Sequence, residues 1–543
     1  MMTKRDGGGA APEIFDYVIV GGGSAGCVLA NRLSEGGANR VLLLEAGPHD
    51  RLLSIRMPAA FVRVLGSRRT WLYGTEPEPG AKGRSLHVPQ GRTLGGGSSV
   101  NAMVYIRGDA ADYDGWRDLG CRGWGFDEVL PFFRKAEGNA RLAGRFHGTE
   151  GPLRVTDTPY RHPLSAAFVR AAQEDGARYN HDFNGESQIG IGFYQVTAFD
   201  GERGSTARTY LRPAERRANL TVRTDALATR ILFTDKRAEG VAYRDARGRM
   251  VEVKAAGEII LTAGALATPK LLMLSGVGPA DHLKAHGIAL VQALEGVGGN
   301  YQDHLEVPVI GRTREAISLL GADRGFRALA HGLQWLLFRS GLLTSNLVES
   351  GGFWDLDGDG RADLQFHVLP LIVGDIDRAP LPGHGISLNP CFLAPKSRGR
   401  IQLRSARADD PPHFHGHYLE REEDVATLIA GVRIARRLLK APSLARLVDC
   451  ELLPGGNIAE DAGALGDYVR SYAKTVYHPA GTCRMGEDAG AVVDPELRVR
   501  GLTGLRIADA SIMPVLPRGN TNAPTIMIAE RAADFIARSP GGE

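Results

Sequence analysis

The chain has 543 residues, of which 43 % are hydrophobic and 23 % are charged, values that exclude a globally disordered protein. Its net charge is only +3, so the overall charge gives no reason to expect nucleic-acid binding. The length predicts about three to four domains, or one large core built from distant segments. Glycine is the outlier, because its 70 residues gather in several short clusters rather than in one repetitive tract.

The ends of the chain and its cysteines indicate where the protein works. Residues 1–13 are polar and glycine-rich, which predicts a disordered lead and no signal peptide. Five widely spaced cysteines without a CxxC pair predict neither a disulfide framework nor a zinc site. No apolar run reaches the about 18 residues of a membrane span, and no internal repeat is found. A cytoplasmic protein is therefore expected.

The first ordered elements form a strand, a helix and a second strand. Residues 16–20 are a β-branched run typical of a buried strand, and residues 41–44 are a second one. Between them, Gly21, Gly23 and Gly26 stand before apolar residues at helical spacing. This order is typical of a βαβ unit that opens a dinucleotide-binding domain.

The glycine turn and the acid that follows it predict a nucleotide site. A helix N-terminus presents free N–H groups to a pyrophosphate, and glycines let the backbone approach closely. Glu45 lies 19 residues beyond Gly26, where a carboxylate accepts hydrogen bonds from both ribose hydroxyls. A carboxylate there would repel a 2′-phosphate, which argues against NADP. The pattern predicts a dinucleotide without separating FAD from NAD, and the alternative is a glycine-rich turn with a surface glutamate.

Further along, strands and helices follow one another. Strands are predicted within 221–233, 240–243, 258–264, 386–404 and 505–509, and helices over 326–343, 422–440 and 523–537. The amphipathic 326–343 helix is interpreted as a core or lid helix, with contact to a membrane surface as the alternative.

Five long motifs carry a family resemblance. They occupy residues 91–105, 264–278, 477–486, 509–511 and 519–524. With them the chain resembles the glucose-methanol-choline family of flavin oxidoreductases, and its tail is most similar to that of choline-dehydrogenase-like alcohol dehydrogenases. The resemblance implies an α/β fold with a discontinuous Rossmann-like FAD-binding domain (14–155, 205–310 and 470–543). It also implies an α+β substrate-binding domain on an antiparallel sheet (156–204 and 311–469).

The same resemblance decides for FAD and implies the residues that hold it. These are Gly21, Gly23, Ser24, Gly26, Glu45, Ala46, Trp71, Thr93, Gly96, Asn101, Ala102, Met103, Val104, Ala228, Tyr477, Asp509, Ala510 and Asn520. Choline oxidases carry a flavin-linking histidine where this chain has Val100. The FAD is therefore predicted to be non-covalent.

Two residues are expected to act on the substrate. Oxidation of an alcohol by hydride transfer needs a base for the hydroxyl proton and a group that holds the oxygen. His478 matches the family's catalytic histidine and is the predicted base, because its ordinary pKa is near neutral. Asn522 matches the family's second position and is expected to hydrogen-bond the substrate oxygen. The predicted function is oxidation of a primary aliphatic or aromatic alcohol to an aldehyde.

The sequence leaves the identity of the substrate and of the electron acceptor open. Glu349 and Phe353 lie in a segment similar to the family's pocket lining. Glu349 could pair with a quaternary ammonium, with cation–π contacts from Phe353, Trp335 or Trp354, which makes choline an alternative substrate. Oxygen and a quinone-type carrier are both open as acceptors. A flavin lyase of the hydroxynitrile-lyase type, a fatty-acid photodecarboxylase and a binding protein with a dead site are the rival functions.

Two short patterns imitate metal sites. Residues 355–360 copy the start of a calcium loop, but Phe366 stands where an EF-hand needs a glutamate, so an acidic turn is expected. The histidines of residues 413–417 are interpreted as structural. No metal is predicted.

Overall fold

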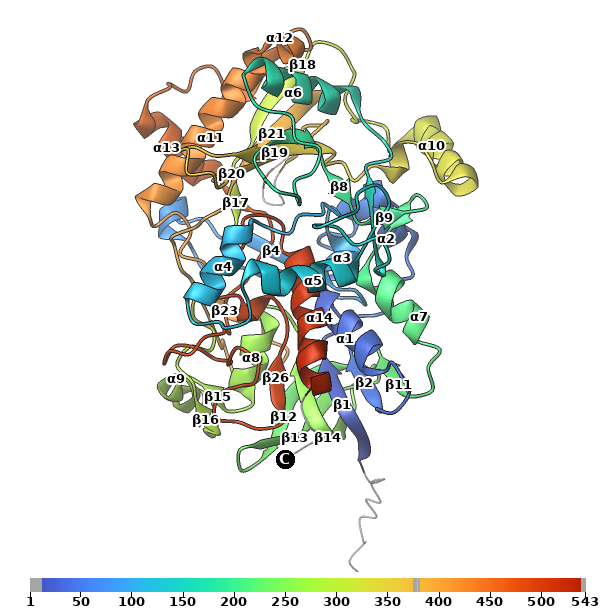
Figure 1. The fold of residues 1–543 in the computed structure, drawn as a ribbon. Coiled ribbons are helices and arrows are strands. Elements are labelled where there is room, and N and C mark those ends of the chain that lie inside the picture. Colours follow the sequence, from blue (N-terminus) through green and yellow to red (C-terminus); the bar gives the residue numbers. More distant parts are fainter. Residues whose placement is uncertain (1–11, 375–377, 379–380, 539–543) are drawn as a thin grey trace, which may run out of the picture.

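A mostly parallel sheet forms one end of the molecule (Figure 1). The computed structural model describes residues 12–374, 378 and 381–538, so the predicted lead lies almost wholly outside the described residues. The strand order is β11-β2-β1-β14-β13-β12, and β26 also pairs with β14. The strands are β1 Glu13–Val20, β2 Val41–Leu44, β11 Leu220–Arg223, β12 Leu227–Thr234, β13 Arg237–Arg244, β14 Met250–Leu261 and β26 Leu505–Ile507. Their buried aliphatic runs confirm the predicted strands.

Two helices from opposite ends of the chain cover this sheet side by side. They are α1 (Ser24–Leu33) and α14 (Asn522–Arg538), which pack against each other (Figure 1). Arg32 on α1 donates two hydrogen bonds to the buried carboxylate of Glu530 on α14, at 2.9 and 2.7 Å. The turns before both helices therefore reach the same edge of the sheet, where the parallel strands end.

A second sheet, antiparallel throughout, forms the other end of the molecule (Figure 1). Its strands are β7 Gly190–Phe193, β17 Leu305–Glu306, β18 Val309–Thr313, β19 Ser350–Trp354, β20 Leu364–Leu369, β21 Gly385–Phe392, β24 Val448–Leu453 and β25 Lys474–Thr475. These two sheets confirm the α/β class with an antiparallel second layer. β17 and β25 were expected in the first domain, but their strand partners lie in the second sheet. The division into two domains otherwise stays a prediction.

The helix expected over 422–440 is α11 (Glu422–Lys440), which packs on β21. Its apolar positions recur at helical spacing and are buried, so one face of the helix belongs to the core of the second sheet. Three acids occupy the first turn, and Arg437 and Lys440 lie in the last. These charges complement the helix dipole and stabilise both ends of the helix, which begins and ends at the predicted residues.

Helix α10 (Gly325–Phe338), which corresponds to the helix predicted over 326–343, projects from the side of the molecule (Figure 1). It ends earlier than predicted because Arg339 adopts a left-handed conformation with φ of 50°. Trp335 is its one buried residue, so of the expected core or lid helix the core interpretation does not hold. Among the helices of the described ranges, none combines the length and apolar character needed to cross a bilayer.

Candidate active site

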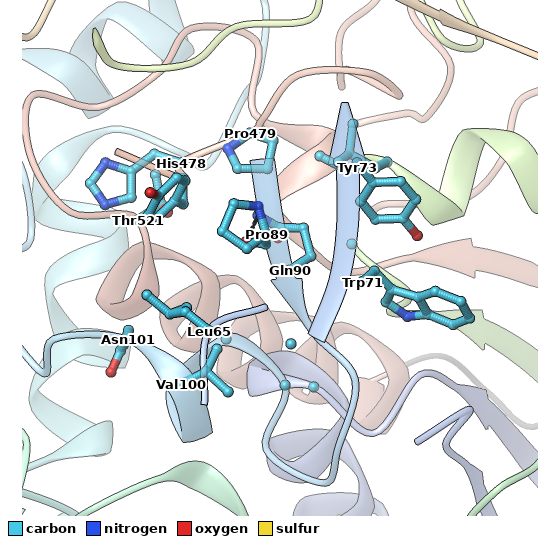
Figure 2. Close-up of a pocket in the computed structure, with 18 of the residues that line it drawn as sticks. Leu65, Trp71, Tyr73, Pro89, Gln90, Val100, Asn101, His478, Pro479 and Thr521 are labelled. Atoms are coloured by element: carbon cyan, nitrogen blue, oxygen red, sulfur yellow. Dashed lines mark hydrogen bonds between the residues drawn. The ribbon is translucent and has the colours of Figure 1, made fainter. Parts of the chain in front are cut away.

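One cavity of about 940 Å³ runs from the parallel sheet to the antiparallel sheet. At the first sheet it is lined by residues at the ends of β1, β2 and β14, among them Val20, Leu44 and Thr262. At the second sheet it reaches Glu306 on β17 and His367 on β20. Figure 2 shows His478 on one side of this space and Trp71 with Tyr73 on the other. The volume and length suit an extended ligand rather than a small substrate alone.

The glycine turn after β1 has no room for side chains. A Cβ on Gly21 would lie 2.5 Å from the carbonyl oxygen of Thr262, and one on Gly26 would lie 1.9 Å from that of Gly21. Gly26 therefore serves close packing of α1 on the turn and does not itself line the cavity. Because Gly23, the N-cap, contributes no side-chain hydrogen bond, the first N–H groups of α1 are left for an anion.

Glu45, the predicted ribose acceptor, directly follows β2 and borders the cavity. Its buried carboxylate accepts hydrogen bonds from the backbone N–H groups of Gly22 and Gly47, at 2.8 and 2.7 Å. Burial raises the pKa of Glu45 to about 7, although the two N–H groups oppose this shift. A carboxylate can accept more than two hydrogen bonds, so capacity remains for a ligand's hydroxyls.

The second glycine cluster lines the middle of the cavity. Gly96, Val100 and the run 101–104 all border it, and Val100 and Asn101 are drawn in Figure 2. Thr93, also expected to contact the cofactor, does not border it. Its hydroxyl donates to the carbonyl oxygen of Pro48 at 2.8 Å, and the residue is fully buried inside the loop. Thr93 therefore shapes the loop from within, and its contact with the cofactor stays a prediction.

His478 is held in one orientation by a second histidine that the sequence analysis missed. The Nδ1 atoms of His478 and His304 are 3.1 Å apart, and Nε2 of His304 lies 3.1 Å from the carbonyl oxygen of Leu393. A carbonyl only accepts, so His304 carries its proton on Nε2 and its Nδ1 is an acceptor. His478 must then donate from Nδ1, which leaves the lone pair of its Nε2 free.

Asn520, rather than Asn522, faces that lone pair. The Nδ2 of Asn520 lies 3.3 Å from Nε2 of His478, and its Oδ1 accepts a hydrogen bond from Gln365 at 3.1 Å. Asn522 is the first residue of α14, and its Oδ1 accepts a hydrogen bond from the hydroxyl of Ser24 at 2.8 Å. Asn522 was expected at the substrate oxygen and Asn520 at the cofactor. In the structure, Asn520 lies beside the histidine and Asn522 contacts the start of α1.

Charge and burial keep His478 unprotonated. Burial lowers its pKa well below the usual value, and the neighbouring His304 and His367 lower it further. Burial also lowers the pKa of His304 to about 3, so this neighbour is neutral. The nearest acid, Asp303, accepts the backbone N–H of His478 at 2.8 Å and does not bond its ring. Burial raises the pKa of Asp303 to about 6.

Polar residues of the second sheet form the far end of the cavity. Glu306 accepts hydrogen bonds from Nδ1 of His367 at 2.9 Å and from Nδ2 of Asn389 at 2.8 Å. The ammonium of Lys474 lies 3.5 Å from the same carboxylate. All four residues border the cavity, and aliphatic residues such as Leu369 complete this end. The negative charge of Glu306 is therefore already paired with the positive charge of Lys474.

The two residues expected to bind substrate lie elsewhere. Glu349 is fully buried, and its carboxylate accepts the backbone N–H of His162 and the hydroxyl of Ser345, both at 2.6 Å. Phe353 points into a cluster with Phe183 and Tyr194, at ring distances of 5.4 and 6.4 Å. Neither borders the cavity, so the structure does not bring these two residues to the other expected site residues. The acid holds the start of a helix, and the ring fills the core.

The other expected contacts do meet at the cavity. The residues that border it are Gly21, Gly23, Ser24, Glu45, Ala46, Trp71, Gly96, Asn101, Ala102, Met103, Val104, Ala228, Tyr477, His478, Asp509, Ala510, Asn520 and Asn522. Asp509 accepts the backbone N–H of Gly264 at 2.9 Å and the hydroxyl of Thr268 at 2.7 Å. It therefore joins the second and fourth motifs at one place.

The expected acidic turn lies away from this site. Strands β19 and β20 flank it, and Asp355 accepts the N–H groups of Gly358 and Gly360 at 2.7 and 2.8 Å. The carboxylates of Asp355, Asp357 and Asp363 come within 4.8 Å of one another. Backbone donors thus already occupy the oxygens of Asp355.

Known proteins similar to this chain share both its length and its fold. An alcohol dehydrogenase [acceptor] of Pseudomonas putida is 47 % identical over 97 % of this chain and 96 % of its own length. Human mitochondrial choline dehydrogenase is 44 % identical over 98 % of this chain and 91 % of its own length. The pyridoxine 4-oxidase structure from Mesorbium loti superimposes with a TM-score of 0.88 at 32 % identity, covering 97 % of this chain and 99 % of that one.

Two family models, both described as GMC oxidoreductase, match residues 15–306 and 395–529. Together they cover the glycine turn, the second glycine cluster and the histidine–asparagine pair. The chain belongs to the GMC oxidoreductase family.

Proposed function

We propose that this protein is an FAD-dependent enzyme that oxidises an uncharged primary alcohol to the aldehyde. The observation that carries the proposal is the free Nε2 lone pair of His478 beside the amide of Asn520, inside a cavity that begins at a dinucleotide turn. The alcohol and choline dehydrogenases that resemble the chain over almost its whole length support the same reaction class.

The residues present fit FAD. The glycine turn and α1 suit the pyrophosphate, Glu45 suits a ribose, and the small residues at 101–104 leave space for a flat ring. When bound, FAD supplies the acceptor for the hydride that leaves the alcohol's carbon. Val100 borders the cavity and has no nucleophilic atom, which supports a non-covalent cofactor. Denaturing the protein with acid is expected to release free flavin, and flavin retained on the chain would contradict this.

His478 and Asn520 divide the work on the hydroxyl group. An alcohol oxygen takes the place of the direct hydrogen bond between them: it donates its proton to Nε2 of His478 and accepts a hydrogen bond from Nδ2 of Asn520. The proton leaves for the histidine as the hydride leaves the carbon, so the aldehyde forms without a net charge on oxygen. The low pKa of His478 keeps the base ready at neutral pH.

The second-sheet end of the cavity favours an uncharged substrate over choline. A quaternary ammonium needs a free carboxylate or an open aromatic face. Glu306 is matched by Lys474 at 3.5 Å, and Trp71 already carries the Arg92 guanidinium 4.3 Å from its ring centre. The aliphatic lining beside them suits a hydrocarbon chain.

Anaerobic titration of the purified yellow protein with primary alcohols and choline tests the proposal. Bleaching of the flavin absorption by an uncharged alcohol is the expected result. Bleaching by choline alone would refute the substrate class, and no bleaching by any alcohol would refute the reaction itself and favour a lyase or photoenzyme. Admitting air afterwards separates an oxidase, whose flavin re-oxidises quickly, from a dehydrogenase that needs a quinone-type acceptor.

A further inference from the structure

Helix α10 turns its apolar face to solvent. Phe326, Leu329, Leu333, Leu336 and Leu337 are 83 %, 65 %, 53 %, 58 % and 61 % exposed. At 100° per residue these five side chains fall within a sector of about 100°. The usual arrangement of a surface helix is therefore inverted, because the face that normally packs on the core is the one in water.

The opposite side of α10 attaches it to the body. Trp335, on that side, is 2 % exposed, and its indole N–H donates to the carbonyl oxygen of Gly201 at 2.7 Å. The guanidinium of Arg339 lies 4.0 Å from the centre of the same ring. These contacts hold the helix in one orientation, so its outward apolar face is a fixed feature of the fold.

Charges around this face are mainly positive. No residue of α10 is acidic, while Arg327 on the helix and Arg324 immediately before it are exposed. The nearby acid, Asp323, lies 3.4 Å from Arg63 and 3.9 Å from Arg324, so one carboxylate faces two guanidinium groups. Together with Arg327 these residues keep an excess of positive charge, and apolar side chains bordered by such an excess complement an apolar layer covered by negative headgroups.

The mouth of the cavity lies on the same side of the molecule. Val62 and Leu72 border the cavity and are 51 % and 47 % exposed. Val62 belongs to η1 (Pro58–Arg63), which packs against η4 (Leu342–Thr344), the turn that follows α10. The ion pair between Arg63 and Asp323 joins η1 to the residues just before α10 as well. A surface that meets α10 therefore also meets the entrance to the active site.

A second copy of the chain is a poorer occupant than a membrane. A helix of 14 residues is about 21 Å long and about 10 Å wide, so two such faces would bury about 400 Å² in total. Stable protein interfaces bury about 1,200–2,000 Å². A two-fold contact would also bring the arginines of both copies together.

We propose that α10 docks the protein on the surface of an anionic lipid bilayer. Its apolar face lies among the headgroups and the first acyl carbons, Arg324 and Arg327 meet lipid phosphates, and the cavity mouth opens beside the lipid. An apolar alcohol or a lipid-soluble electron acceptor then reaches the site without crossing water. The docking itself does not depend on the proposed reaction, and it is read out separately from turnover.

Flotation of the full-length, FAD-loaded protein with vesicles tests the docking. The protein is expected to float with phosphatidylcholine–phosphatidylglycerol vesicles, less with pure phosphatidylcholine, and less as salt rises. The double variant Leu333→Gln, Leu337→Gln is expected to weaken binding about tenfold for each leucine lost from the apolar face. Its turnover of a water-soluble alcohol with a soluble dye acceptor stays unchanged.

A matched control changes exposed apolar residues away from α10. Met250 and Leu290 are 60 % and 52 % exposed beside the first sheet, and Met250→Gln, Leu290→Gln is expected to float like the unchanged protein. The proposal would be overturned if the protein floated with neither type of vesicle, or if both double variants lost vesicle binding to the same extent. A dimer in solution that the α10 variant converts to a monomer would identify a second copy as the occupant and also overturn it.

Discussion

Two asparagines near the start of α14 can be separated by their effects on chemistry and on cofactor binding. Asn520 donates from Nδ2 to Nε2 of His478 at 3.3 Å, so an oxygen that contacts Nε2 in its place is also within reach of the Asn520 amide. Asn520→Leu removes the one amide donor at this position while keeping a similar volume. Loss of a single preorganised donor to a developing oxyanion costs about 10²–10³ in rate. We therefore expect flavin reduction by saturating alcohol to slow by about that factor, with FAD still bound.

Asn522 makes the matched comparison. Its Oδ1 accepts a hydrogen bond from the Ser24 hydroxyl at the first turn of α1, where a pyrophosphate would bind. Asn522→Leu removes one hydrogen bond, worth about 1 kcal/mol, which corresponds to about fivefold weaker FAD binding. Because the contact lies away from His478, the rate of flavin reduction is expected to stay close to that of the unchanged protein.

Stopped-flow reduction without oxygen measures the rate, and titration of the protein freed of flavin measures FAD affinity. The assignment predicts opposite patterns for the two variants: Asn520→Leu loses rate and keeps affinity, whereas Asn522→Leu keeps rate and loses affinity. Slow reduction in Asn522→Leu together with normal reduction in Asn520→Leu would refute the assignment drawn from the geometry.

Three further outcomes follow from the same site. His478→Ala is expected to lower kcat by about 10²–10⁴ with FAD retained, and an unchanged kcat would contradict the assignment of the base. In the unchanged protein, kcat should fall on acidification only below pH 6.5, because burial lowers the pKa of His478. Lys474→Met leaves Glu306 without its cation, so kcat/KM for choline relative to a neutral alcohol should rise about tenfold. His304 has a pKa lowered to about 3, so its stabilising effect is present above pH 6.5 and is lost on acidification towards pH 3. Unfolding titrations should show a loss of about 1.4 kcal/mol per pH unit in that window, reduced in His304→Gln.

Local patterns predicted the fold well, because each depends on residues close together in the sequence. The strand–turn–helix at residues 16–33 needs only a β-branched run, glycines where side chains would collide, and helical spacing of apolar residues. The α11 helix was expected over its observed range because its charges and its buried face agree. The apolar residues of α10 recur at helical spacing just as clearly, but this spacing does not say whether the apolar side of the helix faces the core or the solvent.

Contacts across long sequence distances were not predictable in the same way. His304 and Gln365 meet His478 and Asn520 only through the arrangement of the second sheet, and neither stands in a motif. The choice between two asparagines two residues apart depends on the turn that leads into α14. Glu349 was expected at the substrate because its segment is similar to the family's pocket lining, yet its carboxylate accepts hydrogen bonds from a buried backbone N–H and a hydroxyl.

The surroundings of His478 keep the ring unprotonated, because burial lowers its pKa and no acid is paired with the ring. A carboxylate bonded to Nδ1 would raise the pKa of the ring and favour its protonated form before substrate arrives. Here the partner of Nδ1 is neutral His304, and the Asp303 carboxylate is engaged by the backbone N–H of His478. The ring therefore stays unprotonated, in the tautomer that directs its lone pair towards Asn520. Proton transfer from the alcohol then becomes favourable only as the hydride leaves, which couples the two steps and avoids a free alkoxide in the cavity.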